Sequence, residues 1–130
     1  MEKSAVAAKG VHQPTAPYSQ AVDAQGHRTL YISGQVPEDA DGNLVGKDDI
    51  RAQTVQVFEN IKALLGAAGG TFGNVVKVGI FVTDIRYRDT ITEVRRQYLQ
   101  DPFPAATMVE ISGLVSPDWM VEIEAVAVLD

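Results

Sequence analysis

The sequence predicts an α+β fold in which two helices cover one face of a mixed β-sheet. Two observations support this prediction. Segments with strand-like and helix-like periodicity follow one another in the order strands, helix, strand, helix, strands. The length of 130 residues, with 45% hydrophobic and 22% charged residues, is typical of a single globular domain. We expect residues 1–12 to be a flexible tail and residues 13–130 to form that domain.

The first strands are predicted from the alternation of polar and apolar residues. Residues 20–23 and 29–33 alternate in this way, and the segment between them contains Gly26. This pattern is typical of a β-hairpin, so we expect these two strands to pair with Gly26 in their turn. A second turn is expected at residues 39–43.

Two amphipathic helices are predicted further along the chain. Apolar residues recur at helical spacing over residues 50–68, preceded by two aspartates and followed by Gly69 and Gly70. The β-branched segment 75–83 then predicts a strand. Residues 90–93 have capping-box spacing and start a second helix, which ends before Pro102. Its expected buried face contains the apolar and aromatic side chains of Ile91, Val94 and Tyr98.

Two final strands are expected over residues 106–111 and 120–129, joined across residues 116–118. Side chains alternate between the two faces of a strand, and the last strand has apolar residues on both faces. A sheet with a single covered face does not require this. We therefore expect part of that surface to be covered by another subunit.

Composition disfavours several functions. The 11 basic and 17 acidic side chains give a net charge of −6, which disfavours a nucleic-acid partner. Without cysteine the chain has no disulfide or thiolate nucleophile, and two isolated histidines do not predict a metal site. No glycine-rich phosphate motif is present, so we expect no cofactor. No apolar run approaches membrane-span length, and we expect a cytoplasmic protein without a membrane partner.

Four parts of the chain match known motifs in one order: residues 16–21, residues 32–37, residues 53–70, and residues 104–110 with 121–127. They resemble the signatures of the reactive-intermediate deaminase (Rid, or YjgF) family. Residues 16–21 are similar to its Gly-Pro-Tyr-Ser-Gln-Ala, and residues 32–37 to its Ser-Gly-Gln-Ile-Pro. Residues 53–70 resemble its Gln-Thr-x-x-x-Leu-x-Asn-Ile-Lys helix and the Ala-Ala-Gly that ends it. Residues 104–110 and 121–127 resemble Pro-Ala-Arg-Ser/Thr and Glu-Ile-Glu-Ala. Together the matches extend over roughly residues 14–128.

The resemblance implies a fold, an assembly and an activity. Proteins of the family have a chorismate-mutase-like fold and form homotrimers, in which three sheets close into a barrel with ligand clefts between subunits. The family's arginine grips the carboxylate of a reactive enamine or imine, and a glutamate helps to position the water that releases ammonia. A guanidinium is a planar two-pronged donor for a carboxylate, and a carboxylate can orient water or move a proton.

Carried over residue by residue, the resemblance assigns a set of candidate positions. Glu122 is the expected catalytic residue, with Tyr18 and Ser33 also matching the family pattern. Ala106 stands where the family has its arginine, and Thr92 stands where it often has asparagine. With Thr107, which follows Ala106, these positions form the predicted substrate site: catalytic Glu122, and Tyr18, Ser33, Thr92, Ala106 and Thr107 for binding a small metabolite.

The alanine leaves two readings of the function open. In one, the protein binds a small metabolite in clefts between subunits and hydrolyses an enamine, imine or related reactive intermediate without the arginine clamp. In the other, it is a non-catalytic metabolite-binding or regulatory protein on the same scaffold. Whether another cation compensates for Ala106 is a separate open question, for which the candidates are Arg28, Lys77, Arg95 and Arg96. Glu122 and Glu124 also have a simpler interpretation, as acidic residues that line a solvated strand.

Overall fold

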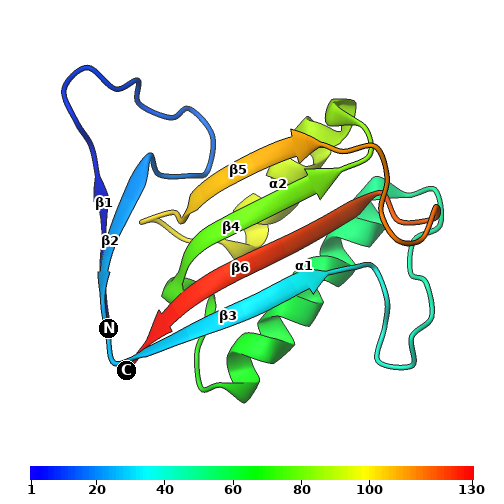
Figure 1. Cartoon of the computed structure of the whole chain (residues 1–130), viewed down its shortest axis with the longest axis horizontal. Helices are drawn as coiled ribbons and strands as arrows, with labels where there is room; N and C mark the ends of the chain where they lie inside the picture. Colours follow the sequence, from blue (N-terminus) through cyan, green and yellow to red (C-terminus); the bar gives the residue numbers. More distant parts are fainter.

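A four-stranded mixed sheet with two helices on one face forms the body of the molecule (Figure 1). The computed structural model describes residues 1–130. The strand order is β3–β6–β4–β5, and these strands extend over Arg28–Gln35, Val121–Leu129, Val75–Val82 and Ala105–Glu110. Strand β4 is parallel to β5, whereas β6 is antiparallel to both of its neighbours. The predicted α+β arrangement is confirmed.

The helices α1 (Ile50–Ala67) and α2 (Arg88–Tyr98) pack on the same face of the sheet (Figure 1). Helix α1 begins after Asp49, whose side chain accepts a hydrogen bond from the Ala52 amide at 3.1 Å, as predicted. Its end is followed by Gly69, which has a positive φ of 85°. Helix α2 begins two residues before the predicted capping box, because the 3₁₀ turn Ile85–Tyr87 leads directly into it.

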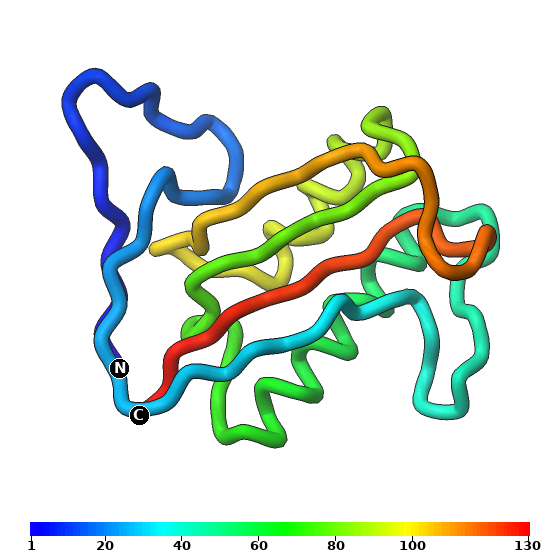
Figure 2. Tube along the Cα trace, viewed as in Figure 1, coloured from blue at the N-terminus to red at the C-terminus, as the bar shows by residue number.

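The predicted N-terminal hairpin is wrong. Strand β2 (Ala21–Gln25) pairs with β1 (Glu2–Val6), which lies in the segment expected to be a flexible tail, while β3 pairs with β6. These two short strands form a separate ribbon beside the main sheet, and the two chain ends lie close together (Figure 2). The physical reason lies at Gly26: a Cβ there would be 2.6 Å from the carbonyl oxygen of Leu129. The glycine allows close contact with β6 instead of shaping a hairpin.

The two faces of the sheet differ in cover. Alternate residues of β6 are buried beneath the helices: Val121, Ile123, Ala125, Ala127 and Leu129. The intervening residues of β6 point to the opposite face, which no helix covers (Figure 1). We call this surface the open face; its residues include Tyr31 and Ser33 of β3, Gly79 and Phe81 of β4, Thr107 and Val109 of β5, and Glu122, Glu124, Val126 and Val128 of β6. Neither helix is long and apolar enough to cross a membrane.

Candidate functional site

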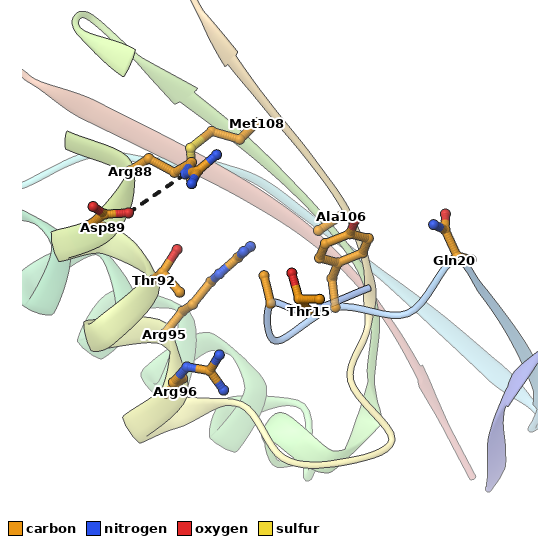
Figure 3. Close-up of a pocket in the computed structure, with 11 residues that line it drawn as sticks. Thr15, Gln20, Arg88, Asp89, Thr92, Arg95, Arg96, Ala106 and Met108 are labelled. Carbon is orange, nitrogen blue, oxygen red and sulfur yellow. Dashed lines mark ion pairs between the residues drawn. The ribbon is translucent and has the colours of Figure 1, made fainter. Parts of the chain in front are cut away.

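A pocket of about 580 Å³ lies on the helix side of the sheet, between α2, the start of β5 and the loop that precedes β2 (Figure 3). Three of the predicted substrate-binding residues line it: Tyr18 from the loop, Thr92 from α2 and Ala106 from β5. Residues far apart in the sequence therefore meet at one place. We call this the arginine pocket, because Arg88, Arg95 and Arg96 of α2 also line it.

The loop that carries Tyr18 is fixed to the start of β5. The Ser19 amide donates a hydrogen bond to the carbonyl oxygen of Pro104 at 3.0 Å, and its hydroxyl donates one to that of Phe103 at 2.5 Å. Ser19 is buried and forms an isolated parallel bridge with Ala105. These bonds hold Tyr18 next to the strand that bears Ala106, which explains how a segment far away in the sequence joins the pocket.

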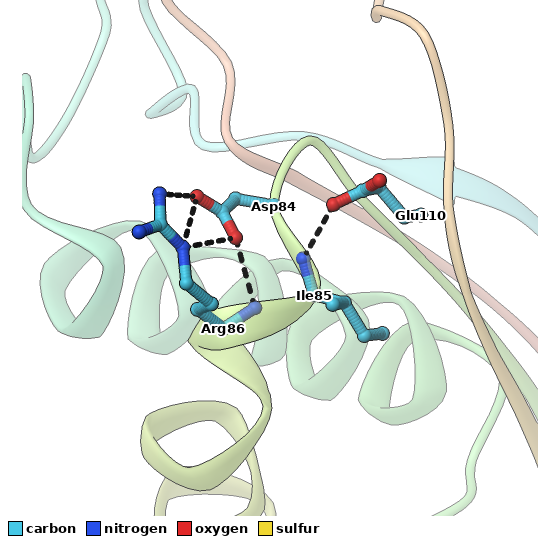
Figure 4. Close-up of polar contacts among 4 residues, drawn as sticks. All are labelled: Asp84, Ile85, Arg86 and Glu110. Atoms are coloured by element: carbon cyan, nitrogen blue, oxygen red, sulfur yellow. Dashed lines mark hydrogen bonds and ion pairs between the residues drawn. The ribbon is translucent and has the colours of Figure 1, made fainter.

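The beginning of α2 is held to the far end of β5 (Figure 4). The amide of Ile85 donates a hydrogen bond to the Glu110 carboxylate at 2.9 Å. Asp84 accepts bonds from both the side chain and the amide of Arg86, which hold the pKa of Asp84 below its usual value. The 3₁₀ turn is thereby ordered just ahead of the helix that carries the arginines.

The end of α2 is held by aromatic packing. The Tyr98 ring stacks on Phe58 of α1 with a centroid distance of 5.1 Å and contacts the edge of Phe72 at 5.5 Å. Its hydroxyl donates a hydrogen bond to Glu59 at 2.7 Å. Burial, with this bond and the negative charge of Glu59, raises the pKa of Tyr98 to about 12. Arg95 lies one turn earlier, so the same packing sets its position.

Arg95 is the unusual side chain of the pocket. Only 5% of its surface is exposed, and its Nε atom has no hydrogen-bond partner. Burial lowers the pKa of Arg95, as does the charge of Arg96, while Tyr18 acts in the opposite direction. A buried guanidinium nitrogen without a partner costs free energy in the isolated chain. Figure 3 shows this side chain extending from α2 into the space beside Ala106.

The charge of the arginine pocket is opposite to that of the whole protein. Three arginines line it against one acidic residue, Asp89, whose carboxylate lies 3.7 Å from the Nε of Arg88. Two positive charges therefore remain uncompensated in a protein with a net charge of −6. Such a local concentration of positive charge attracts a small anion.

A second group of polar residues lies on the open face. The Glu122 side chain lies over Gly34, where a Cβ would be 2.7 Å from the carboxyl carbon. Glu124 lies over Gly79 in the same manner, with its Cγ 3.0 Å from the Cβ position. Thr107 is the register partner of Gly79 on the other side. Two glycines thus make room for two carboxylates on the open face.

The predicted site residues therefore form two separate groups in one chain. Tyr18, Thr92 and Ala106 meet in the arginine pocket. Ser33 is adjacent to Gly34, beneath Glu122, and Thr107 is also on the open face. Ala106 is in register with the buried Val78 and Ala125, whereas Glu122 is in register with Phe81 on the opposite face. The sheet itself separates the two groups.

Two of the four candidate replacement cations lie elsewhere. The Arg28 side chain donates to the carbonyl oxygens of Asp130 at 2.7 Å and Ala68 at 3.2 Å, at the start of β3, the edge strand opposite β5. Lys77 is exposed on β4. Arg95 and Arg96 are the two that line the pocket.

Comparisons with known proteins agree with this architecture. A model of the family described as endoribonuclease L-PSP matches residues 10–129. The chain belongs to this family, the Rid/YjgF proteins. The Rid/YjgF protein YyfB of Yersinia pestis, whose function is unknown, has a TM-score of 0.87 at 31% identity, covering 99% of this chain and 100% of its own. RidA from an Antarctic Psychrobacter has a TM-score of 0.72 at 36% identity, covering 96% and 93%.

Curated relatives of this Rid/YjgF chain match over similar lengths. A RutC family protein of Pyrococcus horikoshii is 39% identical over 125 residues, which are 96% of this chain and 97% of that protein. A 2-iminobutanoate/2-iminopropanoate deaminase of Dermatophagoides farinae is 37% identical over 118 residues, or 91% and 90% of the two chains. The family resemblance stated from the four sequence segments is confirmed.

Sequence reasoning missed one of the three arginines of the pocket in this Rid/YjgF protein. Arg88 was not among the candidates, although Arg88, Thr92, Arg95 and Arg96 recur at helical spacing and so share one side of α2. That spacing was the available signal. No sequence pattern signalled the burial of Arg95, and the loop that lines the pocket with it comes from the N-terminal part of the chain.

Proposed function

We propose that this protein binds a small anionic metabolite in the arginine pocket and, as a homotrimer, hydrolyses an enamine or imine there. The observation that carries the proposal is the separation of the two polar groups. A cationic pocket lies on the helix side of the sheet, and Glu122 lies on the open face. One subunit supplies the pocket, and a neighbouring subunit supplies Glu122.

The open face provides the reason for assembly. Tyr31 is 77% exposed and Val109 is 39% exposed, and both point away from the helices. The edge strands of the sheet, β3 and β5, each have a side that no main-sheet strand covers. Closed cyclic assembly of three chains covers such a face and removes the open strand edges.

The chemistry follows from the residue types. The ligand's carboxylate pairs with guanidinium groups, and the hydroxyls of Tyr18 and Thr92 contact its polar atoms. The carboxylate of Glu122 orients a water molecule, which adds its oxygen to the carbon of the C=N bond. The nitrogen takes up the protons released from water and leaves as ammonia when the C–N bond breaks, and the carbon becomes a carbonyl. The relative from Dermatophagoides farinae is named for such a reaction on 2-imino acids.

A non-catalytic metabolite-binding protein is the second candidate. The specific observation in its favour is Ala106, a methyl group at the position where the family resemblance implies an arginine. The family is described as endoribonuclease L-PSP, but the net charge of −6 disfavours RNA binding, so neither candidate function involves RNA. Turnover separates the two candidates, because a binder shifts its melting temperature with a ligand and leaves the imine unchanged.

The test is an assay of imine loss. The imines are 2-iminopropionate and a 2-imino dicarboxylate, each generated in place by an amino-acid oxidase and trapped with semicarbazide. We expect the protein to accelerate the loss of at least one of them. Glu122→Gln should reduce kcat by about 100-fold or more, since it removes a group that orients water and moves protons. Glu124→Gln is the matched control on the same strand and should retain most activity. Ligand-dependent melting shifts without turnover of either imine would favour the binder.

A further inference from the structure

We propose that Arg95 is the anion anchor of the arginine pocket and that the pocket's ligand is a small dicarboxylate. This inference rests on the proposed function and names its substrate class. The first carboxylate pairs with Arg95 in the interior of the pocket, and the second is balanced by the exposed Arg88 and Arg96. The anchoring guanidinium is thus supplied by helix α2 instead of strand β5.

The environment of Arg95 carries the first half of the inference. Arg95 is only 5% exposed, and its Nε has no hydrogen-bond partner in the chain. Buried polar atoms are nearly always paired in native proteins, so a missing partner indicates a ligand or a second chain. The planar guanidinium fork matches a carboxylate with two parallel hydrogen bonds. The small side chain of Ala106 leaves the facing wall open for that carboxylate (Figure 3).

The charges of Arg88 and Arg96 support the second half of the inference, that the ligand is a dicarboxylate. Arg88 is partly balanced by Asp89, and Arg96 has no ion pair in the structure. Arg95 and Arg96 are adjacent, and the charge of Arg96 disfavours the charged form of Arg95. A monocarboxylate leaves one positive charge of the pocket without a partner, whereas a dicarboxylate balances both. We therefore expect affinity to rise with the second carboxylate, most strongly at low salt.

The experiment is calorimetric titration of the full-length protein at low ionic strength with a matched pair of oxo acids. The probes are 2-oxoglutarate and 2-oxobutanoate, which differ in the second carboxylate, and inorganic phosphate is the third arm. We expect 2-oxoglutarate to bind at least tenfold more tightly than 2-oxobutanoate, a difference of about 1.4 kcal/mol. If phosphate binds as tightly as 2-oxoglutarate, the site is a general dianion site and the assignment to dicarboxylates is overturned.

Variants test separately the role of Arg95 as anchor and the assignment of a dicarboxylate ligand. Arg95→Gln should weaken both oxo acids at least tenfold, whereas Arg96→Gln should weaken 2-oxoglutarate more than 2-oxobutanoate. Lys62→Gln, an exposed site on α1, is the control for the loss of one positive charge. Ala106→Arg in the Arg95→Gln background returns a guanidinium to the facing strand and should restore 2-oxobutanoate binding. The thermal unfolding of each variant shows that it is folded.

The outcomes also separate this inference from the proposed function. Equal affinity for the two oxo acids overturns the dicarboxylate assignment and leaves a carboxylate-binding pocket in place. Unchanged binding in folded Arg95→Gln overturns the anchor. If neither oxo acid nor phosphate binds the wild-type protein, the dicarboxylate inference is wrong. Continued turnover of 2-iminopropionate would then show that the proposed function survives without it.

Discussion

The arginine pocket and the open face of the sheet carry side chains of opposite charge. The pocket gathers positive charge around a buried, unpaired Arg95 and is built from three segments that are fixed by hydrogen bonds and aromatic packing. The open face has no helix over it, and its carboxylates Glu122 and Glu124 lie over glycines of neighbouring strands. One region can hold an anion, whereas the other can orient water.

This difference shows why a single chain is insufficient for the proposed chemistry. Side chains of adjacent residues on a strand point to opposite faces, so a sheet cannot bring Ala106 and Glu122 together. In the proposed trimer, the open face of a second chain brings the Glu122 carboxylate to the pocket. Four predictions test the roles of these two regions and of the helix that carries the arginines, and they are ordered by the size of the expected effect.

The largest effect is expected from mixing two inactive variants. Ala106→Trp fills the pocket, and Glu122→Gln removes the carboxylate from the open face, so each variant alone should lack activity. In trimers assembled from equal amounts of both, a complete site forms where an intact pocket meets an intact Glu122. Random assembly gives this at about one quarter of the interfaces, so about a quarter of wild-type activity should return.

As a control, separately assembled trimers of the two variants are mixed under conditions without subunit exchange. This mixture should show no recovery of activity. Light scattering should give a trimer mass for each variant and for the mixture. If co-assembled trimers remain inactive while both variants fold, the pocket and Glu122 do not serve the same site.

The second prediction concerns the glycines beneath the two glutamates. Gly34→Ala places a Cβ 2.7 Å from the carboxyl carbon of Glu122, so that side chain must move. We expect kcat to fall about tenfold to 100-fold, with unchanged affinity for an oxo acid. Gly79→Ala is the matched control, because it displaces Glu124 by the same kind of contact. Equal losses in both variants would mean that the two glutamates act together.

The third prediction concerns the stability of the pocket without a ligand. Arg95→Met replaces a buried arginine, whose Nε lacks a partner, with an unbranched apolar side chain. We expect the free energy of unfolding to rise by about 1–2 kcal/mol and the melting temperature by about 3–8 °C. Oxo-acid binding should be lost at the same time. Arg96→Met, at the exposed neighbouring position, should change stability little, and a destabilised Arg95→Met would show that the guanidinium supports the fold.

Much of the fold, but only part of the candidate site, could be predicted from the sequence. Helix α1 was predicted because Asp49 and Gly69 mark its ends and its apolar residues keep one spacing. The hairpin failed because local alternation says that β2 and β3 are strands without saying which strands they pair with. The partner of β3 is β6, about a hundred residues away.

The candidate site also shows that a local sequence pattern does not reveal which distant segments meet. Tyr18, Thr92 and Ala106 were placed in one group by resemblance, and the structure brings them together. The burial of Arg95 was not predictable, because an arginine on an amphipathic helix is usually exposed. The loop that lines the pocket with it comes from a distant part of the chain. Helical periodicity gives the direction of a side chain relative to its own helix, but it does not show which other segments cover it.

The smallest effect is expected at Tyr98, which holds the end of α2 against α1. Its pKa is raised from 10.0 to about 12, so the folded protein favours the neutral hydroxyl. The resulting stabilisation is complete below pH 10 and is lost as the pH rises from 10 to about 12. The free energy of unfolding, measured in urea at intervals across this range, should fall less in Tyr98→Phe than in the wild type. Tyr31→Phe removes a hydroxyl from the open face and should keep the wild-type fall, because Tyr98 is still present. An unchanged fall in Tyr98→Phe would show that the packing of the arginine helix does not depend on this hydroxyl.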